Sequence, residues 1–483
     1  MRGVGEVFET DVPARLDRLP WSHFHWLVVA ALGITWILDG LEVTLVGALA
    51  PALKGPLGLG LSDAQIGLTA SAYVFGVVVG AVVFGRLTDI FGRRRMFMIT
   101  VGIYAAATVA SGFSWDFWSF MLFRFATGMG IGGEYGAINS AIDELVPARR
   151  RGFTAVAVNG TWWVGTALGA VGSTFLLDPA VISQDWGWRL AFFTGGLLAV
   201  VILFIRRYVP ESPRWLMTHG RHEEAQAIVA AIERRVERRT ALPPMFAPHP
   251  KIRLVGRTRT SWSEVAITLF KTHPKRTVLG VILMATQAFC YNAIFFTYAQ
   301  MLTRFYDVPP KNVGWFILPF ALGNVLGPLV LGRLFDSWGR RPMIGGSYAI
   351  SGVLLCLTGW MFAQGMLTAE TQTIAWSVIF FFASAAASAA YLTVGELFPL
   401  ETRAMTISLF VAFGTLLGGV GAPALFGALI GQGERGEVFL GYLLGGGLML
   451  VGALAAWFLG VKAERKPLEM VAAPLSLASE ERR

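Results

Sequence analysis

Four ionisable residues stand inside long apolar stretches of this 483-residue sequence, where charge is costly and therefore informative. Asp39 and Glu42 are three residues apart, which places both on one face of a helix. Arg124 and Glu134 lie in another apolar stretch, about three helical turns apart. An ionised side chain facing lipid costs at least ~2.5 kcal/mol, so these four should face a protein interior and pair. Carboxyl and guanidinium groups in such a setting suit proton uptake or the binding of a charged solute.

Our hypothesis is that Asp39 takes up a proton and that Arg124 modulates this uptake. With Arg124 close, Asp39 stays ionised; when the two separate in an apolar site, desolvation favours the protonated form. The alternative is a static ion pair that holds two helices together. Glu42 and Glu134 could be further proton sites, ligands for a cationic solute, or structural acids. Arg124 could equally receive a substrate carboxylate.

A second group of charges forms a motif that occurs twice. The first copy is Gly85-Arg-Leu-Thr-Asp-Ile-Phe-Gly-Arg-Arg-Arg95, and Gly332-Arg-Leu-Phe-Asp-Ser-Trp-Gly-Arg-Arg341 repeats it about half a chain length later. Glu144-Leu-Val-Pro147 with Arg151 recurs at nearly the same offset as Glu396-Leu-Phe-Pro399 with Arg403. Two anchors at one offset indicate an internal duplication, so the chain consists of two similar halves.

We interpret these repeated charges as a gate at the cytoplasmic edge of a membrane protein. Pairing between helices would close the inner side and break as the halves move. Positive-inside topology alone is the alternative, and it explains the arginines but neither the aspartates nor the repeated glycines. The candidate gate residues are Asp89, Arg93, Arg94, Glu144, Arg151, Glu211, Arg214, Asp336, Arg340, Arg341, Glu396 and Arg403.

The composition indicates a membrane protein. The chain is 54% hydrophobic and 15% charged, with a mean hydropathy of +0.58. Its apolar runs of roughly 20 residues are long enough to cross a ~30 Å hydrocarbon core as helices. We therefore predict an all-α fold with twelve transmembrane helices in two pseudo-symmetric bundles of six. The predicted spans lie near 24–50, 63–86, 94–112, 116–144, 152–177, 188–208, 275–304, 311–335, 342–363, 370–397, 404–430 and 437–461.

The predicted domains follow from these spans. Loops rich in Lys and Arg alternate with loops that are poor in them, which places both termini in the cytoplasm. The net charge of +9 is then a topological signal and does not indicate a nucleic-acid partner. We predict an N-terminal segment that is partly disordered or lies on the membrane, and a linker with an amphipathic helix. The boundaries are 1–22 for the cytoplasmic N-terminal segment, 23–208 for the first bundle, 209–272 for the linker, 273–462 for the second bundle and 463–483 for the tail.

These motifs resemble those of the major facilitator superfamily. The repeated Gly-Arg-x-x-Asp-x-x-Gly-Arg-Arg carries this resemblance, and the segment from Arg124 to Gly133 looks like its helix-4 motif. Pro210-Glu-Ser-Pro-Arg-Trp-Leu216 is similar to the sugar-porter-like branch, whereas Asp39-Gly-Leu-Glu-Val43 looks like the synaptic-vesicle-glycoprotein-related and metabolite:proton symporter groups. The resemblance covers nearly the whole chain. It implies solute transport and an acid in helix 1 opposite the helix-4 arginine.

The solute site of such duplicated carriers lies near mid-membrane between the halves. Gln287 and Asn292 keep the sugar porters' helix-7 spacing. Tyr391 stands where those proteins carry a tryptophan, and Trp162-Trp163 where they carry a glutamine, so the pocket departs from the sugar pattern. The candidate pocket residues are Trp36, Trp162, Trp163, Gln287, Tyr291, Asn292, Phe295, Phe296 and Tyr391.

We therefore expect a secondary active transporter of the inner or plasma membrane that works by alternating access as a proton symporter. An aromatic or carboxylated metabolite is favoured as solute over a sugar or an organic cation. The alternatives are an uncoupled facilitator and a transport-inactive receptor or scaffold. No hydrolase, zinc-protease or phosphate-loop motif is found, so we expect no enzyme activity, no cofactor and no metal. We expect a monomer whose partners are the solute, protons and lipid.

Overall fold

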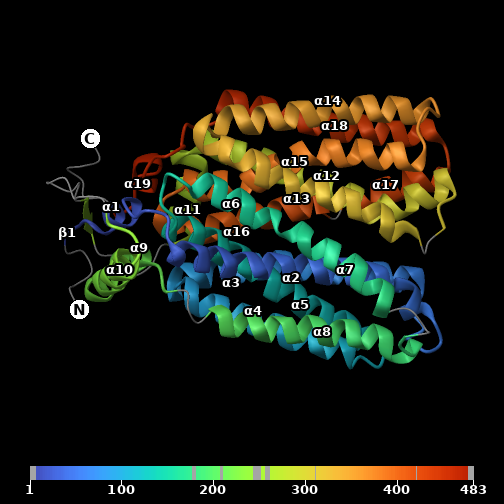
Figure 1. The fold of residues 1–483 in the computed structure, drawn as a ribbon, viewed down its shortest axis with the longest axis horizontal. Coiled ribbons are helices and arrows are strands. Elements are labelled where there is room, and N and C mark those ends of the chain that lie inside the picture. Colours follow the sequence, from blue (N-terminus) through green and yellow to red (C-terminus); the bar gives the residue numbers. More distant parts are fainter. Residues whose placement is uncertain are drawn as a thin grey trace.

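The structure is a computed structural model that describes residues 7–176, 181–206, 210–242, 252–255, 261–309, 312–419 and 421–476. Long helices run side by side along the longest axis of the molecule, with the N-terminal set on one side and the C-terminal set on the other (Figure 1). The first bundle contains α2 (His23–Lys54), α3 (Asp63–Phe91), α4 (Arg93–Gly112), α5 (Phe117–Leu145), α6 (Arg151–Gly160), α7 (Trp162–Leu176) and α8 (Gln184–Arg206). The second contains α12 (Pro274–Tyr306), α13 (Val313–Ser337), α14 (Arg340–Ala363), α15 (Ala369–Leu397), α16 (Arg403–Gly414), η4 (Thr415–Gly419), α17 (Gly421–Gln432) and α18 (Arg435–Leu459).

The predicted number of transmembrane spans is confirmed. Among the described residues, ten helical segments are long and apolar enough to cross a membrane. The other two spans are α5, whose charged residues lower its hydropathy, and the pair α6 and α7, which is interrupted at Thr161. The segment α16–η4–α17 forms the eleventh span and is interrupted by a π-helical turn at η4.

The two copies of the charged motif have the same backbone conformation. Gly92 precedes α4 with φ 95° and ψ 159°, and Gly339 precedes α14 with φ 107° and ψ 160°. A side chain would be strained at these positive φ angles, so the repeated glycines are explained. Each one reverses the chain between two antiparallel helices and sets the following arginine against the helix before it.

Small residues bring α3 and α5 into close contact. A Cβ added at Gly76, Gly128 or Gly132 would collide with the backbone of the facing helix. Contact of this kind between apolar helices relies on small residues because lipid provides no hydrophobic drive for their association. The packing holds Tyr73 of α3 beside Arg124 of α5, with the Arg124 guanidinium 4.6 Å from the centre of the Tyr73 ring.

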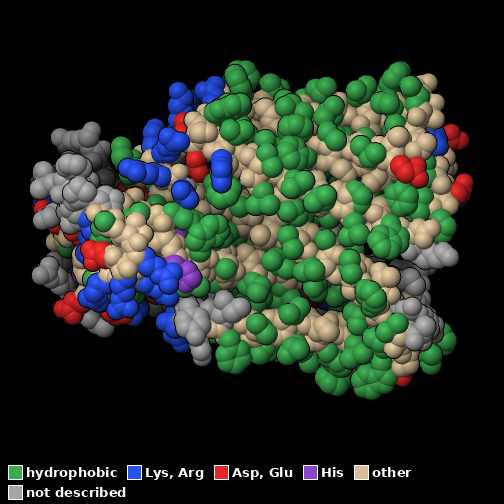
Figure 2. Space-filling view, viewed as in Figure 1, with side chains coloured by type: hydrophobic (Ala, Val, Ile, Leu, Met, Phe, Trp, Pro, Cys, Tyr) green, Lys and Arg blue, Asp and Glu red, His purple; other side chains and the backbone are tan. Residues whose placement is uncertain are grey.

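A small subdomain of short elements lies at one end of the bundle. It contains α1 (Val12–Asp17), α9 (Pro213–Thr218), α10 (His222–Glu237), α11 (Trp262–Ile267), η1 (Thr268–Thr272), η3 (Leu400–Thr402), α19 (Leu468–Val471), and the antiparallel strands β1 (Val7–Thr10) and β2 (Ile252–Val255). We call this the basic end, because Lys and Arg gather over it while hydrophobic side chains cover the visible flank of the bundle (Figure 2).

Residues 7–22 of the N-terminal segment are ordered: they form β1 and α1 and dock on the linker helix α10. Both oxygens of Glu233 in α10 accept hydrogen bonds from Arg15, at 3.1 and 2.5 Å, and Arg18 adds a bond of 2.5 Å. Burial opposes ionisation of Glu233, but the hydrogen bonds from these arginines lower its pKa below the ordinary value. The predicted amphipathic helix is α10, whereas most of the proline-rich stretch after it, residues 243–251, lies outside the described residues.

Candidate functional site

A cavity of about 200 Å³ lies between the two bundles. Seven of the nine predicted pocket residues line it, and the side chains of the other two, Phe295 and Phe296, lie outside the described part of the structure. The lining residues include tyrosines, an asparagine and hydroxyl residues that the sequence analysis missed. The full lining is Trp36, Val43, Tyr73, Val74, Val77, Tyr135, Asn159, Trp162, Trp163, Gln287, Ala288, Tyr291, Asn292, Ser384, Ala387, Ser388, Tyr391 and Thr415.

Aromatic rings from both bundles form one wall of this cavity. Trp36 of α2 stacks on Tyr135 of α5, with ring centres 5.0 Å apart and planes 15° apart. Tyr391 of α15 meets Trp36 edge to face, with ring centres 5.6 Å apart, and also bonds to the Gln287 side chain. Flat rings fixed in this way suit the stacking of a planar solute.

A second aromatic group involves Trp163. Its ring lies 5.5 Å from Tyr291 and 5.3 Å edge to face from Phe320, centre to centre, so an N-terminal side chain packs among C-terminal ones. Tyr291 donates to Oδ1 of Asn324 over 2.9 Å. Trp162 contacts Trp163 directly, with their ring centres 4.8 Å apart. Trp163 thus belongs both to the cavity wall and to the contact between the bundles.

Non-aromatic polar side chains are fewer in the cavity than aromatic ones, and those described in its lining are amides and hydroxyls. The Asn292 amide donates to the Ala288 carbonyl over 2.7 Å. Nδ2 of Asn159 donates to the Ala155 carbonyl over 2.8 Å and to Oδ1 of Asn139 over 3.2 Å. Its Oδ1 then has no partner within the described protein. A buried amide in an apolar span requires partners, and this is the signal that could have identified Asn159 from sequence.

Deeply buried charges lie close to the cavity. Arg124 forms an ion pair with Glu42, and its guanidinium also lies 5.8 Å from the centre of the Phe192 ring. Asp39, Glu42, Arg124 and Glu134 are each no more than 3% exposed. The predicted pairing of Arg124 with Asp39 is therefore wrong for this conformation. Because α2 and α5 are antiparallel, a residue one turn further along α2 lies nearer the level of Arg124.

Asp39 has a different environment. Its charged neighbours are the carboxyl groups of Glu134 and Glu42, and its Oδ2 atom has no hydrogen-bond partner among the described residues. Asp39 lies one turn from Trp36, which lines the cavity. The arrangement therefore places next to the cavity wall a buried carboxyl group that has no guanidinium partner in the described part of the chain.

At the basic end, each copy of the charged motif builds the same arrangement. In the first, Arg93 pairs with Asp89 at 3.2 Å and with Glu144 at 2.9 Å.

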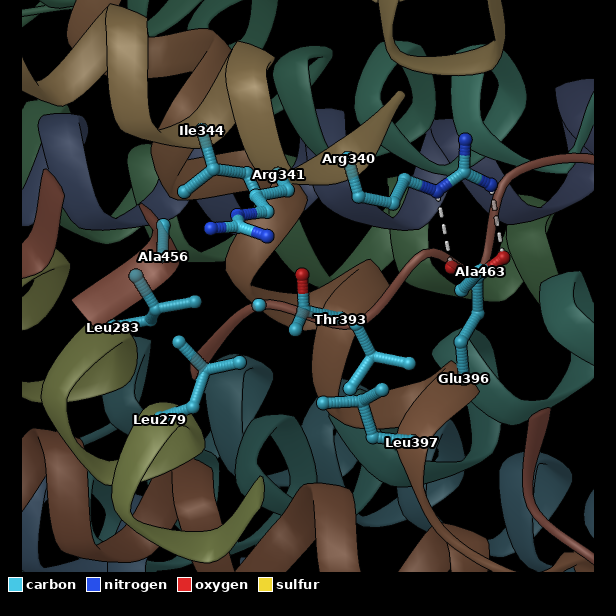
Figure 3. Close-up of a pocket in the computed structure, with 12 residues that line it drawn as sticks. Leu279, Leu283, Arg340, Arg341, Ile344, Thr393, Glu396, Leu397, Ala456 and Ala463 are labelled. Carbon is cyan, nitrogen blue, oxygen red and sulfur yellow. Dashed lines mark hydrogen bonds and ion pairs between the residues drawn. The ribbon is translucent and has the colours of Figure 1, made fainter. Parts of the chain in front are cut away.

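In the second copy, Arg340 pairs with Asp336 at 2.8 Å and binds both oxygens of Glu396, at 3.0 and 2.9 Å (Figure 3). A two-pronged guanidinium–carboxylate pair is among the strongest side-chain interactions. In both bundles these pairs join the first residue of one helix, α4 or α14, to the next helix, α5 or α15.

The two aspartates also reach across to the opposite bundle. Oδ2 of Asp89 accepts from the backbone N–H of Met405, in the first turn of α16, over 2.9 Å. Asp336 accepts from the N–H groups of Gly152 and Phe153, in the first turn of α6, over 3.0 and 2.8 Å. A helix N-terminus presents unpaired N–H groups and the positive end of its dipole to a carboxylate. This contact was not predicted, since the sequence suggested only pairing between charged side chains.

Further ion pairs join the bundles at the same end. Arg403 approaches Glu144 at 3.5 Å, and Arg151 approaches Glu396 at 3.7 Å. Each of these four side chains is at most 1% exposed. The repeated Glu and Arg of the second motif therefore pair with their counterparts from the other half.

The remaining predicted gate residues have varied partners. Oε1 of Glu211 accepts from the backbone N–H of Arg93 over 2.9 Å, and burial raises its pKa despite this bond. The backbone N–H of Arg94 also lies near Glu211, at 3.3 Å. The Arg341 guanidinium instead lies 5.7 Å from the centre of the Trp457 ring.

Arg214 connects several chain segments. It donates to the Glu144 carbonyl over 2.8 Å and forms ion pairs with Glu469 at 3.0 Å and Asp17 at 3.1 Å. Burial works against its charge, but these carboxylates raise its pKa. Asp17 also accepts from Arg151 over 3.3 Å, so both terminal segments contribute to the network.

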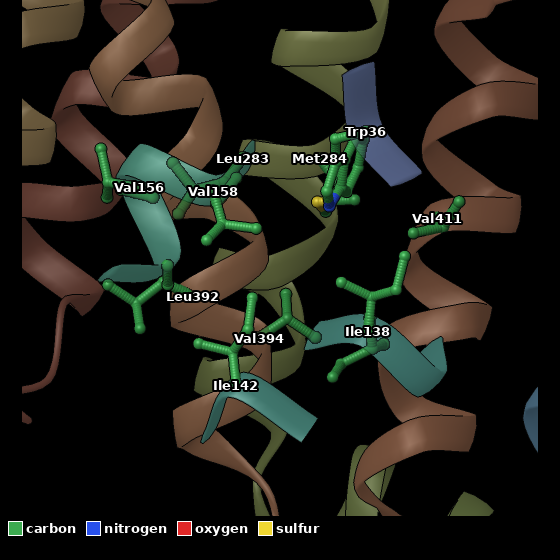
Figure 4. Close-up of a cluster of buried hydrophobic side chains, with 14 of the residues drawn as sticks. Trp36, Ile138, Ile142, Val156, Val158, Leu283, Met284, Leu392, Val394 and Val411 are labelled. Carbon is green, nitrogen blue, oxygen red and sulfur yellow. The ribbon is translucent and has the colours of Figure 1, made fainter. Parts of the chain in front are cut away.

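An apolar layer accompanies this network (Figure 4). Ile138 and Ile142 of α5 belong to the same buried cluster as Leu392 and Val394 of α15, and each is at most 1% exposed. Val156, Val158, Leu283, Met284 and Val411 complete this layer, and all are buried. In this conformation, apolar side chains from both bundles therefore fill this part of the interface.

Comparisons with known proteins agree with this architecture. Residues 32–473 match the sequence model of the family described as "Sugar (and other) transporter". The chain is 26% identical to the niacin transporter NiaP of Acinetobacter baylyi, over 95% of this chain and 99% of the relative. It is 25% identical to the 4-hydroxybenzoate transporter PcaK of the same organism, over 94% of each.

A solved structure shows the same fold. The proton:xylose symporter XylE, bound to 6-bromo-6-deoxy-D-glucose, superposes with a TM-score of 0.74 at 18% identity, covering 93% of this chain and 98% of that one. The chain belongs to the family of sugar and other transporters, and it has the fold of the major facilitator superfamily protein XylE.

Proposed function

We propose that this membrane transporter moves a small aromatic or carboxylated metabolite together with a proton, by alternating access. One observation carries the proposal: a cavity walled by aromatic rings lies between two similar bundles, next to the buried carboxyl group of Asp39, whose Oδ2 has no hydrogen-bond partner among the described residues. The cavity supplies a solute site, the carboxyl group a proton site, and the two bundles the parts that move.

The cavity chemistry supports a planar solute. The stacked pair of Trp36 and Tyr135, with Tyr391 across from them, offers flat apolar surface. Amides and hydroxyls such as those of Gln287 and Asn292 supply donors and acceptors for polar substituents. Relatives described as carriers of niacin, 4-hydroxybenzoate and gallate support the same solute class.

The proton step follows from charge balance. Asp39, Glu42, Glu134 and Arg124 are all charged neighbours of Tyr73, and Glu42 is the ion-pair partner of Arg124. An isolated ionised carboxylate in an apolar interior is strongly disfavoured. A proton on Asp39 would therefore lower the free energy of the site when no solute is bound. We propose that Asp39 binds the transported proton and that the pair of Glu42 and Arg124 stays together while it does so. An incoming carboxylate would then meet a neutral Asp39.

The conformational step uses the basic end, which we assign to the cytoplasm on its content of Lys and Arg. Here the network from Asp89 and Asp336 and the apolar layer join the bundles. We propose that this conformation is closed to the cytoplasm and that opening breaks these contacts. Both aspartates bind helix N-termini, which separate when the bundles rock apart.

An uptake assay tests the proposal. Purified protein in liposomes would be given radiolabelled 4-hydroxybenzoate, nicotinate, xylose or an aromatic amine, with and without an inwardly directed proton gradient. We expect the gradient to accelerate uptake of an aromatic acid. Uptake at the same rate with and without the proton gradient would indicate a facilitator. Binding without uptake would indicate a transport-inactive receptor. Either result would contradict the proposal.

An organic cation is the second candidate solute. The described residues that line the cavity include no Lys, Arg or His, while three carboxyl groups lie nearby. Aromatic rings also bind cations through their faces. Gradient-driven accumulation of the aromatic amine, without accumulation of either acid, would favour this alternative.

A further inference from the structure

The internal repeat places two unlike residues in equivalent positions. Glu144 of α5 and Glu396 of α15 correspond in the two halves, so the residues before them, Asp143 and Gly395, correspond as well. The side chain of Asp143 is not part of the duplicated pattern, and neither the function proposed above nor the repeated motifs use it. It is nevertheless 1% exposed at the interface between the bundles.

These two residues meet each other. A Cβ added at Gly395 would collide with Oδ2 of Asp143. The missing side chain of one half therefore provides the space that the extra side chain of the other half fills. Arg403 donates from Nε to the Gly395 carbonyl over 2.8 Å, which holds the backbone of this notch in place.

The surroundings of Asp143 indicate that the size of its side chain, and not its charge, matters where it contacts Gly395. Oδ2 of Asp143 has no hydrogen-bond partner among the described residues. Its charged neighbours are Arg403, Glu396, Arg151 and Glu144, and Arg214 approaches its backbone carbonyl at 3.4 Å. The four charged neighbours pair among themselves, so the carboxyl group contributes mainly volume where it touches Gly395.

We propose that Asp143 is a gate residue whose side chain seats in the notch at Gly395 and so sets how closely α5 and α15 approach when the basic end is closed. The inference rests on the alternating access proposed above. A methyl group at position 395 would prevent this approach, since overpacking a filled interface is destabilising. A side chain of the same size at position 143 would preserve it.

The test measures the distance between the bundles. Spin labels are attached to cysteines introduced at Phe91 and Trp338, which are 46% and 69% exposed at the basic end of the two bundles. Cys290 and Cys356, the two native cysteines, are first replaced by alanine. We expect Gly395→Ala to lower the ratio of closed to open molecules at least tenfold. Asp143→Asn, which keeps the volume, should leave the ratio unchanged.

Two further variants separate fit from damage to the fold. The double variant Asp143→Gly with Gly395→Asp exchanges the two sides of the contact and should close as the parent protein does. Gly346→Ala is the matched control, because a Cβ at that glycine of α14 meets nothing within 4 Å. The proposal is overturned if Gly395→Ala leaves the ratio unchanged, if Asp143→Asn opens the gate, or if the exchanged pair stays open. A parent protein with one fixed distance, with and without substrate or protons, would instead overturn alternating access itself.

Discussion

Removing the Asp336 carboxylate should open the basic end. In the closed arrangement this group accepts two backbone hydrogen bonds from α6, at Gly152 and Phe153. Hydrogen bonds to a charged group contribute about 1.5–3 kcal/mol each, so Asp336→Ala loses at least about 3 kcal/mol of contact between the bundles. Since about 1.4 kcal/mol corresponds to a factor of ten, the closed-to-open ratio should fall about 100-fold. Arg340 keeps its two bonds to Glu396, so its charge stays paired.

The assay follows access to the apolar layer. A cysteine replaces Ile142, which is fully buried there, and a membrane-impermeant maleimide is added at the basic end in inside-out vesicles. Labelling should become much faster with Asp336→Ala. Ser337→Ala is the matched control, because that exposed hydroxyl bonds only to its own helix in the described structure. Equal labelling rates for Asp336→Ala and the control would refute the account of the gate.

Two further predictions concern the cavity and the docked N-terminal segment. Trp36→Leu should weaken binding of an aromatic solute about tenfold, because it removes the ring that stacks on Tyr135; Trp26→Leu, at an exposed position of the same helix, should leave calorimetric affinity unchanged. Glu233→Gln should release α1, seen as faster hydrogen exchange over Val12–Asp17. Because folding lowers the pKa of Glu233, its ionised carboxylate stabilises the docking of α1 at pH values above the ordinary pKa of a glutamate. This stabilisation is lost as the pH falls through the lowered pKa. Protection factors over α1, corrected for the intrinsic pH dependence of amide exchange, that are identical at pH 7 and pH 3 would contradict this.

Much of the fold could be predicted because membrane spans, tight turns and membrane orientation each require particular residue types at particular spacings. Long apolar runs, repeated glycines and clustered arginines correspond to spans, to positive-φ turns at Gly92 and Gly339, and to the basic end. Aromatic residues and amides in apolar runs also led to seven of the eighteen residues that line the cavity. These features depend on composition and local spacing alone.

The partners of individual charges could not be predicted in this way. Glu42 and Asp39 share a helical face, and only the relative depth of two antiparallel helices decides which one meets Arg124. Asp89 accepts a hydrogen bond from the backbone N–H group of Met405. Because nearly every residue has such a group, the sequence does not indicate which one Asp89 binds. The fit of Asp143 against Gly395 likewise depends on how closely two distant helices approach.

The central claim is that Asp39 carries the coupled proton, and proton movement on substrate addition tests it most directly. Proteoliposomes in weak buffer would receive an aromatic acid with no imposed gradient, while an external pH indicator reports alkalinisation. We predict that the parent protein takes up protons with the solute. Asp39→Asn should still bind the solute but should move no protons and should gain nothing from a proton gradient. Undiminished gradient-driven uptake by Asp39→Asn would contradict the account.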